Sequence, residues 1–178
     1  IGIVIASRIL NGRKINRITG ADMHKCLLEK LNEKNGKCFY LGSSYSTLLK
    51  IEERCMEEYP NIRINSYSPP FTENFSDEEI DKMLTAINNF QPDVLFIGMT
   101  APKQEKWANR HKEVLNAKVI CSIGAVFDFY SGTVKRPNKI WLNLGFEWLG
   151  RLIREPKRMW RRYLYYGPIF IYYVLFKE

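Results

Sequence analysis

Short apolar runs alternate with amphipathic stretches of helical length between Lys37 and Ile120, and this alternation constrains the fold more than any other feature of the sequence. Four apolar runs have the length of buried strands: residues 38–41, 62–65, 94–97 and 119–122. Three intervening stretches carry apolar residues at spacings of three and four: residues 47–58, 77–89 and 104–113. Strands that alternate with helices predict an α/β fold with a Rossmann-like, mostly parallel sheet and flanking helices.

Two more helices are expected before the first strand, at residues 3–10 and 22–33. The chain has 178 residues and is 46% hydrophobic, which is enough for one compact domain. Because Ile1 already stands in an apolar run with a helical pattern, we expect the sequence to be part of a longer protein. We expect residues 1–136 to form the Rossmann-like domain, with an N-terminal part missing, and residues 137–178 to form an appendage.

Positive charge is concentrated near the end of the chain. From Lys135 to Glu178 there are ten Lys or Arg against three Asp or Glu, which accounts for nearly all of the net charge of +8. Pro156 separates two expected helices, 143–154 and 157–165, and residues 168–176 form a short apolar run. That run is far shorter than the ~20 residues that span a bilayer, and no signal peptide pattern is present.

This composition predicts a helical, basic and aromatic appendage that docks on an anionic membrane surface. Five arginines at spacings of three and four are expected to bind lipid headgroups or a lipid diphosphate: Arg151, Arg154, Arg158, Arg161 and Arg162. Single-stranded nucleic acid is a disfavoured partner, because Tyr and Trp beside a short apolar run suit a membrane interface better. A basic solvated helix packed on the body is a third interpretation. The expected location is the cytoplasm, peripherally bound to the inner face of the membrane.

The cysteines and histidines form no recognisable metal or redox motif. Cys26, Cys38, Cys55 and Cys121 are widely spaced among apolar neighbours, so we expect four reduced and buried thiols. His24 and His111 lie in predicted helices without partners at metal-ligand spacing, so we expect solvated or structural roles. We expect no bound metal.

One loop at the end of a predicted strand is a candidate ligand site. Strand 94–97 leads through Gly98 and Pro102 into a helix that begins near Lys103 and Gln104. Ligands of parallel sheets bind beyond the carboxyl ends of the strands, and a helix N-terminus favours phosphate. Lys103 and Gln104 then provide a cation and an amide for a diphosphate or a sugar. An ordinary strand-to-helix loop is the alternative.

Two further loops and one basic residue complete the candidates. Asp128 follows Gly124 after strand 119–122, and it either accepts a hydrogen bond from a base or sugar or caps a helix. Gly42, after strand 38–41, either lets the backbone approach a nucleotide or forms a turn before a helix cap. Arg17 precedes the helix expected at 22 and has no local structural explanation. A dinucleotide-dependent enzyme is disfavoured, because no G-x-G-x-x-G turn follows a strand.

Several motifs resemble those of the WecG/TagA/CpsF family of bacterial glycosyltransferases, glycosyltransferase family twenty-six, over nearly the whole chain. The resemblance is carried by Arg17-Ile18-Thr19-Gly20 with Asp22, by Gly98 with Pro102-Lys103-Gln104-Glu105-Lys106-Trp107, by Gly124-Ala125 with Phe127-Asp128-Phe129, Gly132 and Arg136-Pro137, and by Gly145, Glu147-Trp148-Leu149, Arg151-Leu152, Glu155-Pro156, Arg158 and Arg161-Arg162-Tyr163.

The resemblance implies an inverting enzyme that moves an N-acetylmannosamine-type sugar from a UDP-sugar to an undecaprenyl-diphosphate-linked acceptor, in the synthesis of a surface polysaccharide or teichoic acid. It implies that Asp128 reads the uracil base, that Gln104 is an active-site amide and that Arg17 is a cation for the diphosphate or acceptor. It also implies a reaction without a cofactor or metal. The family's general base is an aspartate of an Asp-Gly pair, which is expected just upstream of Ile1 and is absent from this sequence.

Overall fold

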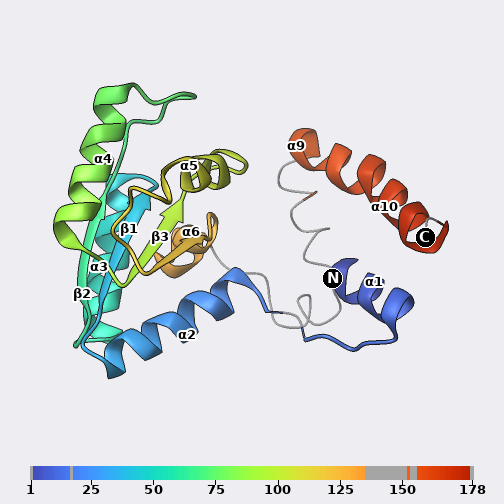
Figure 1. Ribbon diagram of the computed structural model, residues 1–178, viewed down its shortest axis with the longest axis horizontal. Coiled ribbons are helices and arrows are strands. Elements are labelled where there is room, and N and C mark those ends of the chain that lie inside the picture. Colours follow the sequence, from blue (N-terminus) through green and yellow to red (C-terminus); the bar gives the residue numbers. More distant parts are fainter. Residues whose placement is uncertain (1, 17, 135–151, 153–155, 177–178) are drawn as a thin grey trace. The chain divides into compact units, whose positions relative to one another are not determined.

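The computed structural model describes residues 2–16, 18–134, 152 and 156–176 (Figure 1). Arg17, Arg151, Arg154 and most of the expected helix 143–154 lie outside the described residues, and so do the side chains of Arg158 and Arg162. The chain divides into two compact units, one of Thr19–Lys135 and one of Ile1–Ile18 with Arg136–Glu178. The predicted division at residue 136 into a catalytic domain and an appendage stays a prediction.

The unit Thr19–Lys135 is built on a parallel sheet of four strands in the order β2-β1-β3-β4. The strands are β1 (Lys37–Gly42), β2 (Arg63–Tyr67), β3 (Val94–Gly98) and β4 (Val119–Ser122). Every pairing is parallel, and Gly42 at the end of β1 stands opposite Gly98 at the end of β3. The predicted α/β fold with a parallel sheet and flanking helices is confirmed.

Five helices of this unit flank the sheet: α2 (Gly20–Glu33), α3 (Tyr45–Glu58), α4 (Asp77–Phe90), α5 (Lys103–His111) and α6 (Val126–Tyr130). Polar caps fix three of their starts. Thr19 and Asp22 form a capping box at α2, and the hydroxyl of Ser44 accepts from the Thr47 N–H at α3. The Ser76 hydroxyl accepts from the Glu79 N–H at the start of α4.

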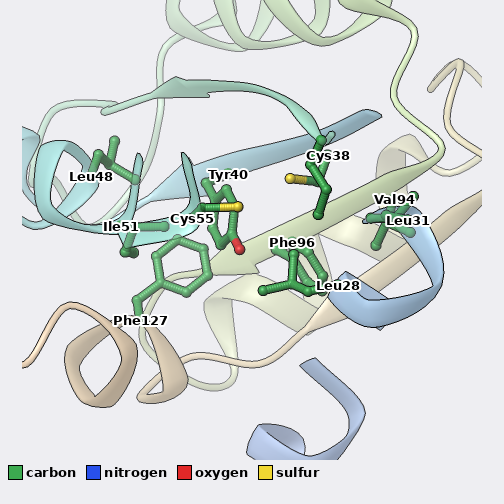
Figure 2. Close-up of a cluster of buried hydrophobic side chains, with 11 residues drawn as sticks. Leu28, Leu31, Cys38, Tyr40, Leu48, Ile51, Cys55, Val94, Phe96 and Phe127 are labelled. Carbon is green, nitrogen blue, oxygen red and sulfur yellow. The ribbon is translucent and has the colours of Figure 1, made fainter. Parts of the chain in front are cut away.

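Alternate residues of the central strands feed two hydrophobic clusters, one on each face of the sheet. Cys38, Tyr40 and Phe96 pack with side chains of α2, α3 and α6 on one face (Figure 2). Phe39, Leu41, Leu95 and Ile97 pack with side chains of α4 and α5 on the other face. Helices therefore cover the sheet on both sides, which leaves the ends of the strands as the place for a ligand.

The described residues of the second unit form the helices α1 (Gly2–Asn11), α9 (Pro156–Trp160) and α10 (Tyr166–Phe176) and a π-helical segment η1 (Arg161–Tyr165). α1 contacts α10, and a Cβ atom added at Gly2 would lie 3.3 Å from the Phe170 ring. Within the described residues, no helix has both the length and the apolar composition needed to cross a membrane.

The cysteines depart from expectation at two positions. All four are free thiols, and Cys38 and Cys55 are buried in the core (Figure 2), but Cys121 on β4 is only half-buried and Cys26 is exposed on α2. The expectation that Cys26 is buried is therefore wrong. It lies between core-facing His24 and Leu28 on a helix whose other face meets solvent. Among the described residues, no group of three or more His, Cys, Asp or Glu side chains is placed to hold a metal ion.

Candidate functional site

The loops that follow β1, β3 and β4 meet at one edge of the sheet. Gly42 has a φ of 109°, and a Cβ atom added there would lie 2.7 Å from the Gly98 carbonyl oxygen. The Ile123 and Gly124 N–H groups donate to the Ile97 carbonyl at 3.0 and 3.2 Å, which ties the loop after β4 to the end of β3. The structure thus brings together the three glycine loops that the sequence singled out.

Gly98 is required by packing against α6. A Cβ atom at Gly98 would lie 2.5 Å from the ring of Phe127, which is buried at the start of α6. The ring fills the space that a side chain at position 98 would occupy. This contact alone accounts for a glycine at the end of β3.

Gln104, in the first turn of α5, has a buried amide that faces the loop after β4. Its side chain is only 6% exposed, and its Nε2 donates to the Glu105 carboxylate at 2.8 Å. Within the described residues, its Oε1 has no hydrogen-bond partner, and it would lie 3.3 Å from a Cβ atom added at Gly124. An unpaired buried acceptor costs about 1–3 kcal/mol, so Gln104 is poised to accept a hydrogen bond from a ligand.

Lys103 is held by the segment between β2 and α4. Its Nζ donates to the Thr72 carbonyl at 2.6 Å and lies 3.5 Å from the centre of the Phe75 ring. Burial lowers the pKa of Lys103, while the nearby Glu73 carboxylate acts in the opposite direction. Pro102, just before α5, is exposed beside it. The lysine that the sequence offered to a diphosphate is thus engaged with a neighbouring loop in this structure.

That neighbouring loop, residues 68–75, is attached to the site at two points and forms a wall beside it. The Ser68 hydroxyl donates to the Ser43 carbonyl at 2.8 Å, next to Gly42, and Lys103 holds Thr72. The only local sign of this wall in the sequence is Pro69-Pro70 after a strand. Its position could not be predicted, because both attachments join residues far apart in the chain.

Asp128 lies inside α6, where its carboxylate is half-buried. Burial raises its pKa, and none of the described residues makes a hydrogen bond or ion pair with its carboxylate. Ala125, not Asp128, occupies the capping position of α6. The helix-cap interpretation is therefore wrong, because the helix begins two residues before the aspartate, and the carboxylate remains available as a hydrogen-bond acceptor.

Three side chains hold the end of α6, and we call Arg54, Glu58 and Tyr130 the Tyr130 clasp. The Arg54 guanidinium donates to the Tyr130 carbonyl at 2.8 Å and to the Glu58 carboxylate at 2.7 Å. It also lies 4.6 Å from the centre of the Tyr130 ring, whose hydroxyl donates to Glu58 at 3.1 Å. No local pattern in the sequence predicts the clasp, because its residues on α3 and α6 are more than 70 positions apart.

The two histidines have structural roles, as expected. His24 Nε2 lies 2.7 Å from the Tyr40 hydroxyl, and its ring meets those of Phe96 and Tyr130 edge-on. Burial lowers the pKa of His24 to about 4, so the ring is neutral at pH 7. His111 Nδ1 lies 2.8 Å from the Trp107 carbonyl in the same helix.

Comparison with known proteins shows which family this arrangement belongs to. The sequence model of the family described as "Glycosyl transferase WecG/TagA/CpsF family" matches residues 1–178. Among curated proteins, the chain is 34% identical over 166 residues to an N-acetylglucosaminyldiphosphoundecaprenol N-acetyl-beta-D-mannosaminyltransferase of Bacillus subtilis (strain 168). Proteins with the same name from Bacillus spizizenii and Staphylococcus aureus (strain MW2) are 30% and 29% identical over 164 and 171 residues.

These alignments cover 92%, 92% and 96% of this chain but only 62%, 62% and 65% of the relatives, so the chain spans less than two thirds of their length. The match nevertheless extends over both compact units and includes all three glycine loops. The chain belongs to the WecG/TagA/CpsF family of glycosyltransferases.

Proposed function

We propose that this chain binds a UDP-sugar at the ends of β1, β3 and β4 and takes part in transferring N-acetylmannosamine to a diphosphoundecaprenol-linked N-acetylglucosamine. The names of the three relatives support the acceptor and the sugar. The placement of the donor site is supported by the buried amide of Gln104, whose Oε1 has no partner among the described residues and faces the Gly124 loop. The helix N-terminus beside it favours a diphosphate.

The proposed reaction is a single displacement with inversion at the sugar. An acceptor hydroxyl oxygen attacks the anomeric carbon, and the bond between that carbon and the UDP oxygen breaks. UDP leaves with the electron pair, and the hydroxyl proton passes to a carboxylate that we place upstream of Ile1. Gln104 orients the donor through its amide, and Arg17 neutralises charge on the departing diphosphate or on the acceptor. Metal independence stays a prediction.

Asp128 is proposed to recognise the base. Its carboxylate has no partner among the described residues and stands on a helix fixed at both ends, by Phe127 and by the Tyr130 clasp. An ionised carboxylate accepts hydrogen bonds and donates none, which suits the single ring N–H of uracil. The same preference disfavours cytosine, whose corresponding ring nitrogen is an acceptor.

The appendage is proposed to bring the enzyme to its lipid-linked acceptor at the inner face of the cell membrane. Arg161 lies 5.6 Å from the Trp160 ring, which places one cation of the arginine series beside an aromatic side chain. Such pairs are typical of membrane interfaces. The other four arginines of the series keep the same proposed role, toward anionic headgroups or the acceptor diphosphate.

The donor site is tested by calorimetric titration of UDP into the Asp128→Asn variant. The substitution keeps the shape of the side chain but removes the charge and half of its acceptor capacity. We expect the UDP affinity to fall by roughly tenfold to a hundredfold, in line with about 1–3 kcal/mol for an unpaired buried partner. Asp81→Asn on α4 is the control, because Asp81 is exposed and belongs to none of the three glycine loops. Equal UDP affinities in both variants would contradict the assignment.

A further inference from the structure

α10 is apolar on every side, which is unusual for a helix at a protein surface. It contains no charged residue, and none of its residues is buried. Eight of its large apolar or aromatic side chains are exposed: Tyr166, Ile169, Phe170, Ile171, Tyr172, Tyr173, Leu175 and Phe176. A helix in water normally keeps a polar face, so the surface of α10 requires an apolar surrounding.

α1 continues this apolar surface, although nothing in the sequence assigned it a role. Its single charged residue is Arg8, and Ile3, Ile9 and Leu10 are exposed. α1 contacts α10, with Gly2 against the Phe170 ring, inside the same compact unit. α1 and α10 therefore lie together in one compact unit (Figure 1), and both helices expose apolar side chains.

The two compact units differ strongly in net charge. Residues 1–18 and 136–178 together carry 13 Lys or Arg against three Asp or Glu, whereas Thr19–Lys135 carries 14 against 16. The first 18 residues alone contain Arg8, Arg13, Lys14 and Arg17 and no acid. An apolar surface in a unit rich in Lys and Arg complements a bilayer of anionic lipid. A second copy of this unit is disfavoured as the occupant, because two strongly basic units repel each other.

We propose that α1 is a second membrane-contacting element, and that α1 and α10 insert together into one leaflet of an anionic bilayer. At 1.5 Å per residue, helices of 10 and 11 residues are ~15 and ~17 Å long, about half the ~30 Å hydrocarbon core. They reach into one leaflet and do not cross. This inference rests on the proposed lipid-linked acceptor. Both α1 and the C-terminal appendage then contact the membrane, instead of the appendage alone.

The experiment measures binding of the full protein to sedimenting vesicles of phosphatidylglycerol and phosphatidylcholine. Leu10→Glu in α1 and Leu175→Glu in α10 place a charge on residues that are 58% and 52% exposed. Met56→Glu on α3, at 55% exposure, is the matched control in the other unit. We expect each of the first two variants to bind at least tenfold more weakly and the control to bind normally. Normal binding by Leu10→Glu would overturn the role of α1.

Insertion is distinguished from surface attachment by the Ile3→Trp variant. We expect its added fluorescence to be quenched by lipids brominated on their acyl chains, because the Ile3 side chain of α1 is 74% exposed. Absence of quenching would overturn insertion. A fall in melting temperature of Leu10→Glu without loss of vesicle binding would show that α1 packs on protein. A dimer without vesicles that Leu10→Glu dissociates would show a second copy, and either result would overturn the proposal.

UDP binding separates this inference from the proposed function. If Leu10→Glu keeps the UDP affinity and loses vesicle binding, both proposals are supported. If the unmodified protein binds vesicles through α1 and binds no UDP, the proposed function fails and the membrane surface stands.

Discussion

Among single residues, His24 has the most constrained surroundings. It is buried between Tyr40, Phe96 and Tyr130, and the pKa of its ring is lowered to about 4 by burial, with Glu58 and Arg54 acting in opposite directions. Protonation of the ring would place a charge in the apolar cluster that supports α6. The protein therefore keeps a neutral histidine where most cores have a hydrocarbon side chain.

This burial predicts a pH-dependent stability. The unfolded chain binds a proton at His24 below about pH 6.5, whereas the folded protein does so only near pH 4, so the unfolded state binds more protons between these values. The contribution of His24 to the free energy of unfolding is fully present above pH 6.5 and is lost as the pH drops toward 4. From pH 7 to pH 5 we expect a loss of roughly 2 kcal/mol from this residue.

Urea denaturation at pH 7 and pH 5 checks the prediction against the His24→Gln variant, which retains a hydrogen-bonding group near Tyr40. The variant should lose less stability over this interval than the unmodified protein. Equal losses would mean that other groups cause the pH dependence.

Single residues also show what the sequence can and cannot predict about the site. Gln104 and Asp128 were found because they follow glycine turns at the ends of apolar strands, a local pattern. The packing of Phe127 on Gly98 and the tether of Lys103 to Thr72 were not found, because they join residues that only the fold brings together. Arg17 was singled out by the sequence and lies outside the described residues.

At the scale of elements, α6 depends on its neighbours. A helix of five residues is too short to be stable alone, since nucleation costs more than so few hydrogen bonds return. The sequence did not predict it for the same reason, whereas helices α1 to α5 and all four strands were predicted to within a few residues at each end. Phe127 anchors the start of α6, and the Tyr130 clasp anchors its end.

Loss of the Tyr130 clasp should loosen α6. We expect Arg54→Met to lower the free energy of unfolding by about 1 kcal/mol, because the Tyr130 carbonyl and Glu58 lose a donor that is partly exposed. UDP affinity should fall as well, since Asp128 stands on the same helix. Arg63→Met on the edge strand β2 is the control, because Arg63 is exposed. Urea denaturation that gives the same stability for both variants would argue against the clasp.

At the scale of the whole molecule, composition and contacts agree on a division that the sequence revealed only in part. The basic appendage was visible as a run of charges, but the pairing of α1 with α10 was not. The contact of Gly2 with Phe170 joins opposite ends of the chain and leaves no local pattern. Both hydrophobic clusters lie entirely within Thr19–Lys135.

That location predicts that a polypeptide of residues 19–135 folds by itself. It retains the sheet, both clusters and the three glycine loops, so we expect a cooperative thermal transition and measurable UDP binding. It lacks α1, α10 and the basic excess, so it should remain in the supernatant when anionic vesicles are sedimented. Failure to fold would show that the second unit contributes to the core, and vesicle binding would place the membrane contact elsewhere.

The wall formed by residues 68–75 has a consequence for how such a site changes during evolution. Both of its attachments end on main-chain oxygens, those of Ser43 and Thr72, and every residue type supplies such an oxygen. Phe71, between the two attachments, is fully exposed and supports no part of the core. Substitutions there leave the sheet and its glycine loops untouched. The residues between the two attachments can therefore change during evolution at little risk to folding. Ser68 and Phe75 are more constrained, because the Ser68 hydroxyl is one of the donors and Phe75 packs against a hydrophobic cluster.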